Sequence, residues 1–476
     1  MRVKHSVCWK MACLAAVNLT AHSHAQDTAD SDPTLDEQIR FFRWLEDYSY
    51  LADESDLNGL ERIKYIPLGL SPKATPYLSF GGQYRFRVVA FDNPIFKLRG
   101  TDDFTSLNHR FLLHSDLQVS NRVRVFGQLG YYQEDGREPN ERSVDESQLD
   151  VHQLFVDIGL SQSNAFSAQA RLGRQEISLP STRFLGVREF PNQRRAFDAV
   201  QLSGHADVLG DGARWQAFYA KPVVPQEDAF EDEASDAIDF FGAYLTLPGL
   251  VGPTDAEVFY LGYEEDDKLW YQGVADEERH TVGLRLLGEA GPWSGILGGA
   301  YQFGTFGEGD ISAWGLESEI AYAFADTPWG PRLALNANYA SGDKDGADVD
   351  LQTFNALFPN LSYFTDAAVY APTNAVDIHP SIAVQPTDTL TLEAGATAIW
   401  RVSDGDGIYG AAYSPLIAPT EGGSYVGTFL DVGATWSPTG RWQLGASYVH
   451  GVSGDLTEDA GGRDFNFLSL TLGYTF

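Results

Sequence analysis

The chain ends in the stretch DFNFLSLTLGYTF, Asp464 to Phe476, in which apolar side chains alternate with small polar ones. An extended strand points successive side chains to opposite faces, so this stretch has one apolar face and one polar face. The apolar face carries Leu468, Leu470, Leu472, Tyr474 and Phe476, and the other carries Ser469, Thr471, Gly473 and Thr475. The apolar face therefore meets either a protein core or lipid.

The first 25 residues have the features of a secretory signal peptide. A basic start is followed by a short apolar run, and Ser23-His24-Ala25 offers small residues for cleavage after Ala25. Both cysteines, Cys8 and Cys13, lie within this segment. The mature chain is thus expected to have neither disulfides nor thiolate metal sites.

Charge and hydropathy exclude two classes of protein. No apolar run after the signal peptide reaches the ~18 residues that a transmembrane helix needs. Removal of Arg2, Lys4 and Lys10 leaves 33 − 3 = 30 basic residues against 66 acidic ones, a net charge of −36. Such a chain repels nucleic acid on average, so we expect no nucleic-acid partner.

The same alternation recurs along the chain, with charged residues confined to one face of each segment. Between residues 77 and 90, for example, Gln83, Arg85 and Arg87 alternate with Tyr84, Phe86 and Val88. Comparable segments begin near residues 110, 122, 332 and 441. These segments predict strands that have one wet face and one apolar face.

The connections between these segments are of two kinds. Eight short turns rich in Gly, Pro, Asn and Asp are predicted near 120–121, 161–164, 209–212, 248–253, 288–292, 326–331, 385–388 and 437–440. Nine longer, mostly acidic loops are predicted at 91–103, 135–147, 179–194, 225–235, 265–277, 305–309, 343–373, 403–423 and 453–463. Seventeen connections imply eighteen strands.

Short turns that alternate with long loops are typical of an outer-membrane β-barrel, with the turns in the periplasm and the loops outside the cell. We therefore predict an all-β fold, an eighteen-stranded antiparallel transmembrane barrel over residues 77–476 in the bacterial outer membrane. Lipid cannot satisfy backbone polar groups, so the last strand must pair with the first. A large soluble all-β protein such as a propeller is the alternative.

Residues 26–76 precede the predicted barrel. Ile39, Phe42, Leu45 and Tyr48 recur at three-residue steps, which predicts a short amphipathic helix over Leu35–Leu51. This helix would lie on the periplasmic side or just within the mouth, and packing on the rim alone is favoured. Residues 27–32 are expected to be a disordered start.

Eighteen strands make a bore too wide for side chains to fill, so loops are expected to narrow it. The two candidates are Leu179–Arg194 and Asp343–Thr373, and the positions of Phe184 and Phe364 would show whether these loops fold inward.

Three stretches resemble the alginate export porin family of eighteen-stranded outer-membrane barrels. They are RWLEDYSYL (Arg43–Leu51) followed by IKYIPL (Ile63–Leu68), RLGRQE (Arg171–Glu176), and VREFPNQRRAFDAV (Val187–Val200). The resemblance in layout extends from about Leu35 to Phe476. It implies an acidic polysaccharide that passes an arginine-rich constriction, and a terminal Phe476 that the barrel-assembly machinery recognises.

The resemblance and the strand pattern together give a set of pore-lining candidates. The family motifs contain Arg171, Arg174, Arg188, Arg194 and Arg195, with Glu176 and Asp198 as their salt-bridge partners. The alternation adds Arg85, Arg87, Arg110, Arg122, Arg124, Arg332, Arg401 and Arg441 as wall residues. Guanidinium stays charged and grips carboxylates with two N–H groups, which suits the selection of anions.

The alternative is that these arginines form wall salt bridges with Glu176, Asp198, Asp116 and Glu393 and confer no selectivity. Alternation also turns Arg174 outward unless a bulge intervenes. As a set, the arginines are nevertheless expected to bias the pore toward anions. The predicted solute is an alginate-like polyuronate first, and a small acid such as a sugar acid second.

Other signals argue against further chemistry. We find no nucleophile elbow, phosphate loop or H-E-x-x-H motif, so a hydrolase is a minor alternative, as is an adhesin. DKDGADVD (Asp343–Asp350) lacks the full calcium-loop pattern and is interpreted as a solvated acidic loop. We predict no catalytic residues, cofactor or metal site, and a monomer in contact with outer-membrane lipid and lipopolysaccharide.

Overall fold

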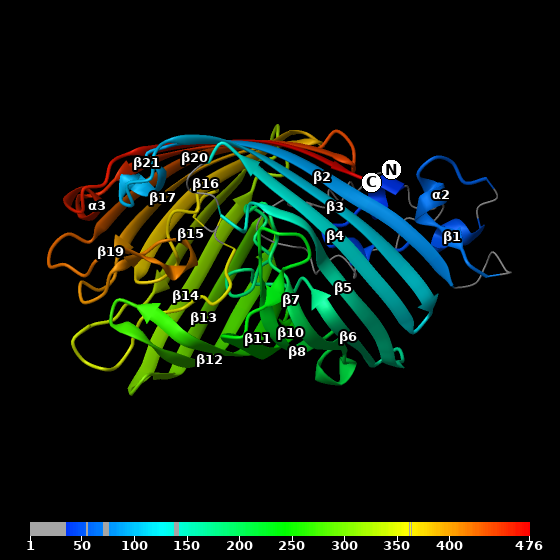
Figure 1. The fold of residues 1–476 in the computed structure, drawn as a ribbon, viewed down its shortest axis with the longest axis horizontal. Coiled ribbons are helices and arrows are strands. Elements are labelled where there is room, and N and C mark those ends of the chain that lie inside the picture. Colours follow the sequence, from blue (N-terminus) through cyan, green and yellow to red (C-terminus); the bar gives the residue numbers. More distant parts are fainter. Residues whose placement is uncertain (1–34, 54–55, 70–75, 138–141, 361, 363) are drawn as a thin grey trace.

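The computed structural model describes residues 35–53, 56–69, 76–137, 142–360, 362 and 364–476. In these residues the chain forms one antiparallel sheet of twenty strands, two of which have only two residues. The remaining eighteen close into a barrel, as the sequence predicts (Figure 1). The predicted signal peptide lies outside the described residues, as do residues 27–32.

The eighteen barrel strands follow one another around the wall in chain order, each antiparallel to its neighbours. They are β2 (Tyr77–Asp92), β3 (Phe104–Ser120), β4 (Val123–Asp135), β5 (Ser147–Gln162), β6 (Ser167–Gln175), β7 (Phe197–His205), β8 (Arg214–Val224), β10 (Ile238–Val251), β11 (Thr254–Trp270), β12 (Gly273–Ala290), β13 (Trp293–Phe306), β14 (Gly309–Ala323), β15 (Arg332–Ala340), β16 (Ala375–Thr387), β17 (Leu390–Arg401), β20 (Tyr425–Trp436), β21 (Trp442–Ser453) and β22 (Phe465–Thr475).

The other elements are short and lie before the barrel or in its loops. The helices are α1 (Leu35–Gln38), α2 (Glu61–Lys64) and α3 (Asp455–Asp459), and the 3-10 turns are η1 (Arg43–Leu45), η2 (Ser49–Asp53), η3 (Pro94–Lys97), η4 (Asp207–Leu209) and η6 (Ala411–Tyr413). The minor strands are β1 (Ile66–Pro67), β9 (Glu233–Ala234), β18 (Ile408–Tyr409) and β19 (Pro415–Ile417). None of the described helices is long and apolar enough to cross a membrane.

The final strand closes the ring. β22 pairs with β2 from Gln83 opposite Thr475 to Asp92 opposite Asn466. The backbone N–H of Gly82 donates to the carbonyl of Phe476 at 2.9 Å, and the N–H of Phe476 donates to the carbonyl of Gly82 at 3.0 Å. These bonds pair the edges of the two terminal strands with each other. An unpaired edge would be unfavourable in a membrane, because lipid offers no hydrogen-bond partners.

The two faces of the wall differ as the alternation predicts. Leu113, Leu316 and Leu470 point outward and are about half exposed, whereas Arg110 and Gln302 point into the lumen and are fully buried. Exposed leucines arranged around a closed sheet require an apolar solvent, which is lipid.

The outward face gives a direct test of this orientation. Leu316 lies in the middle of β14, and its replacement by arginine should cost about 2–4 kcal/mol of folding free energy at the bilayer midplane. Val274 lies near the tip of the β11–β12 hairpin, so Val274→Arg should cost about 0–1 kcal/mol. Urea unfolding in lipid vesicles measures both, and equal costs would contradict the assignment of the lipid face.

Two predicted loops are not loops. Residues 305–309 are a two-residue turn between β13, which ends at Phe306, and β14, which begins at Gly309. Residues 265–277 continue β11 and β12, which run to Trp270 and from Gly273 around a two-residue turn. Trp270 and Glu277 bury their side chains against the inner loops, and the indole Nε1 donates to Glu277 Oε2 at 2.5 Å. This packing keeps the acidic stretch extended as a hairpin that projects beyond the wall.

The predicted amphipathic helix over residues 35–51 is also wrong, because only α1 and two 3-10 turns form there. Glu46 accepts the backbone N–H of Arg40 at 3.2 Å, and its carboxylate pairs with Arg43 at 2.5 Å. A side chain that binds a backbone donor competes with helical hydrogen bonds. Tertiary contacts therefore outweigh the weak tendency of this short segment to form a helix on its own.

This N-terminal segment enters the mouth rather than resting only on the rim. Phe42 and Trp44 are buried against Phe126 of β4, Phe155 of β5 and Val187. Arg43 donates to the carbonyls of Gly82 and Phe476 at 3.0 and 2.9 Å, which fixes the segment to the closing strands. In Figure 1 the segment lies at the end of the barrel that carries the C-terminus.

Candidate permeation pathway

Two long loops fold into the barrel and meet there. They are residues 176–196, between β6 and β7, and residues 341–374, between β15 and β16. Leu185 and Phe358 form a parallel bridge between them, with Gly186 N–H donating to Phe358 O and Phe358 N–H donating to Phe184 O, each at 3.0 Å. We name these segments the inward loops, and the prediction that they fold inward is confirmed.

The inward loops fill much of the lumen with aromatic side chains. Phe184 packs against Phe259 of β11 with ring centroids 5.1 Å apart, and it belongs to a large buried cluster along β7 to β14. Phe364 is buried in a second cluster, which includes Phe429 and Phe465 on the opposite wall. The passage is therefore narrow, although the barrel that surrounds it is wide.

Three of the predicted arginines meet at one loop carboxylate, and a fourth binds the residue next to it. Arg85 and Arg110 reach Glu189 from β2 and β3, and Arg194 pairs with it from the same loop; the Arg85–Glu189 distance is 3.3 Å. Arg87 donates to the neighbouring carbonyl of Phe190 and stacks over its ring at 4.5 Å. We call Arg85, Arg87, Arg110 and Arg194 the arginine cluster.

The arginine cluster carries more positive charge than Glu189 can balance. Burial alone would raise the pKa of Glu189, but Arg110, Arg194 and Arg85 outweigh burial and hold this pKa well below its usual range. Three guanidinium groups pair with this one ionised carboxylate and Arg87 lies beside them, while Glu176 lies 3.8 Å from Arg194. Nε and Nη1 of Arg110 are buried and donate to no described acceptor. Buried donors of this kind favour an anionic acceptor.

Other lumen arginines are neutralised by wall carboxylates. Arg124 binds both oxygens of Asp116 at 2.7 Å, and Arg171 binds Asp157 at 2.7 and 2.9 Å. Arg332 pairs with Glu319 near the periplasmic end. These pairs match the predicted alternative of a salt-bridge ladder, which stiffens the wall without a net charge.

Two further candidates, Arg195 and Arg401, hold loops in place, and a third, Arg188, lies in the first inward loop. Arg195 donates to the carbonyls of Gly186 and Phe358, which ties the two inward loops together. Arg401 donates to the carbonyls of Thr420 and Gly423 at 2.8 and 3.1 Å at the outer end. Arg188 is in a left-handed backbone conformation, with φ at 57°, and its Nε has no described acceptor.

Several predicted lumen residues lie elsewhere. Arg174 and Asp198 face each other across β6 and β7 at 2.8 Å and point outward, because Arg174 is in register with the exposed Leu154. Arg122 is exposed in the turn between β3 and β4. Arg441 lies at the rim and pairs with Asp36 at 2.6 Å. No bulge reverses β6, so alternation rather than the family motif places Arg174.

Glu176 is in the lumen, as expected, but its main partner is a histidine. Its Oε1 lies 2.7 Å from His152 Nε2 and 3.8 Å from Arg194 Nη1. Glu176, the first residue of the first inward loop, and His152 of β5 are both buried. Glu176 is thus placed to position Arg194 rather than to line the passage.

Sequence reasoning missed part of the lumen network. Arg285 of β12 joins Glu257 and Glu317, and Arg183 from the first inward loop also pairs with Glu317, at 2.5 Å. Arg279 pairs with Glu277 at 2.7 Å. Odd-numbered residues of β12 face the lumen, so the alternation of this strand predicts that Arg279 and Arg285 point inward. Arg183 and Glu189 lie in irregular loops and had no such signal.

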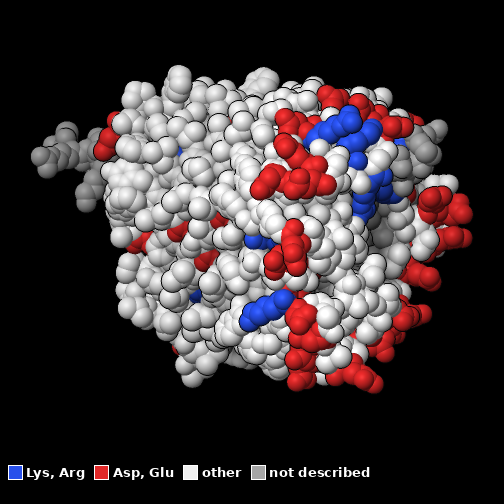
Figure 2. Space-filling view, turned by 90° about the vertical axis from the view of Figure 1, so that its left-hand side faces the viewer, with Lys and Arg blue, Asp and Glu red and all other residues white. Residues whose placement is uncertain are grey.

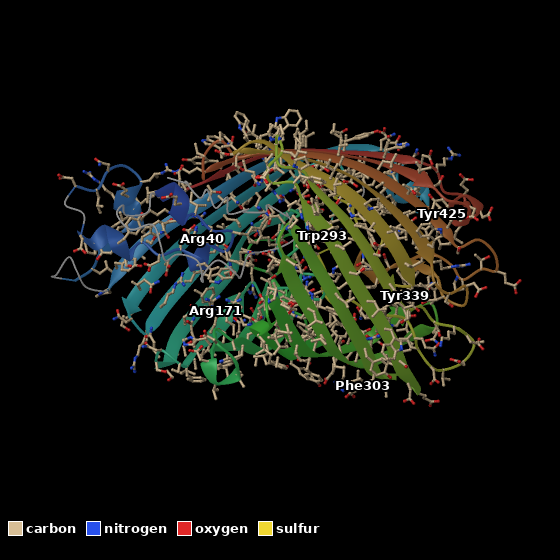
Figure 3. The ribbon with its side chains drawn as sticks, turned by 180° about the vertical axis from the view of Figure 1, so that it is seen from behind. Arg40, Arg171, Trp293, Phe303, Tyr339 and Tyr425 are labelled. Atoms are coloured by element: carbon tan, nitrogen blue, oxygen red, sulfur yellow. The ribbon has the colours of Figure 1, made fainter. Side chains whose placement is uncertain are left out.

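The N-terminal segment contacts three of the lumen arginines at the periplasmic end of the barrel. The guanidinium of Arg171 stacks over Trp44 at 5.2 Å, that of Arg194 stacks over Phe41 at 4.3 Å, and Arg124 Nη1 donates to the carbonyl of Trp44. Figure 3 shows Arg40 and Arg171 at the same end of the barrel. The segment therefore narrows the periplasmic mouth.

Trp44 should anchor this segment more than its exposed neighbour does. Trp44→Ala removes the buried ring from between Phe126 and Phe155, so amide exchange over residues 40–48 should speed up by at least an order of magnitude. Leu45 is more than one-third exposed, and Leu45→Ala should change the exchange little. Hydrogen exchange with mass spectrometry measures both, and equal effects would show that the indole is not the anchor.

The end that carries the long loops is acidic. Figure 2 faces this end and shows many Asp and Glu side chains with fewer Lys and Arg among them. Exposed acids include Glu227, Asp228, Glu231, Asp345 and Asp348. Within the residues placed by the structure, no three His, Cys, Asp or Glu side chains form a group suited to a metal ion.

Comparisons with known proteins agree with this architecture. The model of the alginate export family matches residues 76–470. No curated relative matches the chain by sequence. Among solved structures, Pseudomonas aeruginosa OccK5 (OpdH) is similar with a TM-score of 0.55 at 14% identity, and the match covers 84% of this chain and 98% of that one.

Two other structures from the same organism show the same fold. Pseudomonas aeruginosa OpdQ has a TM-score of 0.56 at 13% identity, over 84% of this chain and 98% of that one. Pseudomonas aeruginosa OccK2 (OpdF), in complex with glucuronate, has a TM-score of 0.52 at 13% identity, over 84% and 96%. At 13–14% identity these matches show that the fold is the same. The chain belongs to the alginate export family and is a porin of the bacterial outer membrane.

Proposed function

We propose that this porin passes an anionic saccharide, with an alginate-like polyuronate as the first candidate, through the arginine cluster. The observation that carries the proposal is the convergence of Arg85, Arg110 and Arg194 on the single carboxylate of Glu189, with Arg87 bound to the carbonyl of the next residue, Phe190. Each uronate unit carries one carboxylate, and guanidinium groups bind carboxylates through charge-assisted hydrogen bonds.

The proposed mechanism is passive. Guanidinium groups replace part of the hydration of a passing carboxylate, and several weak contacts in series let the solute leave as readily as it enters. Glu189 lowers the net charge of the arginine cluster, and this limits how tightly an anion is held. The stacked positions of Arg194 over Phe41 and Arg87 over Phe190 add apolar surface for sugar rings.

A small sugar acid is the second candidate. The inward loops fill much of the lumen, which favours a small solute over a thick chain. The glucuronate complex of the structurally similar OccK2 (OpdF) supports the same class of solute. An extended single polyuronate strand needs little more width than its monomer, so the width of the passage alone does not choose between them.

Bilayer recordings with defined solutes separate the two candidates. A polyuronate of about ten units, added on one side of a single pore, should interrupt the current at micromolar concentration, whereas glucuronate should carry current without long interruptions. The neutral dextran oligomer of the same length is the control and should not interrupt it. Interruption by dextran alone, or by neither polymer, would contradict the polyuronate proposal.

Residues outside the passage complete the proposal. We propose that residues 1–25 are removed as a signal peptide, that residues 26–76 are a periplasmic-side segment and that residues 77–476 are the barrel domain. Phe476 ends the closing strand, where the barrel-assembly machinery would read it. We further propose a monomer whose acidic outer loops contact lipopolysaccharide through divalent cations.

A further inference from the structure

A pocket of about 290 Å³ lies at the outer end of the barrel, away from the arginine cluster. Two loops form it, residues 341–374 and residues 402–424, together with the turn between β11 and β12. Its lining includes Asp343, Asp406, Gly405, Tyr271 and Tyr409. The sequence predicts a solvated loop here, but Asp343 is only 1% exposed, so that prediction is wrong for its first residue.

Asp343 is a buried carboxylate without an ion pair or a side-chain hydrogen bond among the described residues. Neither of its oxygens accepts a hydrogen bond from a described side chain, although the N–H groups of Lys344 and Asp345 lie near enough to favour its charged form. Burial, and then the negative charge of Asp406, raise the pKa of Asp343 to about 6. The exposed Asp348 adds to this effect. A buried charge normally has a partner, so this carboxylate requires one.

Asp406 does not supply that partner and is itself saturated. Its Oδ1 accepts Gly407 N–H and the Tyr409 hydroxyl, each at 2.7 Å. Its Oδ2 accepts Asp343 N–H at 3.0 Å and the Thr353 hydroxyl at 2.6 Å. Four donors fill the lone pairs of one carboxylate and join the two loops. No described Lys, Arg or His forms an ion pair with either acid, so two negative charges stand side by side.

The oxygens of Asp343 have no side-chain partner among the described residues, and the pocket that Asp343 lines has room for a bound ion. Backbone carbonyls converge nearby instead. A Cβ on Gly405 would lie 2.4 Å from Lys344 O and 3.1 Å from Asp343 O, and one on Gly346 would lie 3.1 Å from Gly405 O. Carbonyl and carboxylate oxygens are the ligands that calcium prefers.

We propose that Asp343 is the carboxylate ligand of a calcium site in this pocket, which backbone carbonyls and water complete. The ion would balance the paired charges of Asp343 and Asp406 and fasten residues 341–374 to residues 402–424. A site with one direct carboxylate is expected to be weak, with Kd of roughly 10⁻⁴–10⁻³ M as in extracellular modules. That range suits a site on the cell surface.

Terbium luminescence tests the site directly. Tyr271 and Tyr409 line the pocket, so Tb³⁺ bound there should emit when tyrosine is excited. The detergent-purified barrel, free of lipopolysaccharide, should show one saturable signal that Ca²⁺ displaces and Mg²⁺ displaces poorly. Asp343→Asn should weaken binding by about tenfold or more, and Asp228→Asn, an exposed acid on another loop, should leave it unchanged.

A thermal measurement guards against a variant that merely misfolds. Calcium should raise the Tm of the wild type and of Asp228→Asn, and leave that of Asp343→Asn unchanged, while both variants keep the heat-dependent gel mobility of a folded barrel. The proposal is overturned if the wild type gives no saturable signal. It is overturned equally if a folded Asp343→Asn variant binds and responds as the wild type does.

Discussion

Replacing Arg85 and Arg110 by glutamine should bring the ratio of anion to cation permeability from well above one to about one or below. Both side chains are buried in the lumen and point at Glu189. The double variant removes two of four positive charges and leaves Glu189 with Arg194 as its one remaining ion-pair partner. Inside a narrow, partly desolvated passage such a change acts on every passing ion.

The matched control is the double variant Arg122→Gln/Arg174→Gln. It changes the net charge by the same amount, but Arg122 is exposed in a turn and Arg174 points outward. Reversal potentials in a salt gradient should match the wild type for the control and shift toward the cation side for the cluster variant. If both variants shift alike, net charge rather than the arginine cluster sets the selectivity.

Replacing residues 351–373 by a short Gly-Ser linker should raise single-pore conductance severalfold. This part of the second inward loop supplies Phe354, Leu357 and Phe358 to one lumen cluster and Phe364 and Tyr370 to the other. β15 and β16 pair directly up to Ala340 and Ala375, so the wall does not depend on the loop. The interior of an eighteen-stranded barrel would then be open to water.

The outer part of the same loop provides the control. Residues 344–350 are exposed, and their replacement by a Gly-Ser linker should leave conductance near that of the wild type. Heat-dependent gel mobility checks that both variants fold. A conductance that does not rise after removal of residues 351–373 would mean that the first inward loop, residues 176–196, sets the constriction by itself.

The barrel could be predicted from the sequence because its physics is local and repeated. Each strand alternates apolar and polar side chains in the same way. A sheet with lipid on its outer face and water on its inner face must close into a barrel. Residues 265–277 and 305–309, which were predicted as loops but form two-residue turns between strands, show the limit of that argument. Whether an acidic stretch is a loop or an extended hairpin depends on Trp270 and Glu277 packing against segments far away in the chain.

The site was predicted less completely, for the same reason. Alternation placed Arg85, Arg87 and Arg110 correctly, because they lie on regular strands. It could not indicate that Glu189, in an irregular loop, would be their common partner. The helical pattern of residues 35–51 was misleading, since Phe42 and Trp44 are anchors for lumen contacts and not one face of a helix.

The most direct test of a wet, arginine-lined passage is the reversal potential of the unmodified protein in a planar bilayer under a tenfold KCl gradient. We predict discrete open channels whose reversal potential has the sign expected for chloride permeation. Channels that favour potassium, or a folded protein that inserts without conducting, would contradict it.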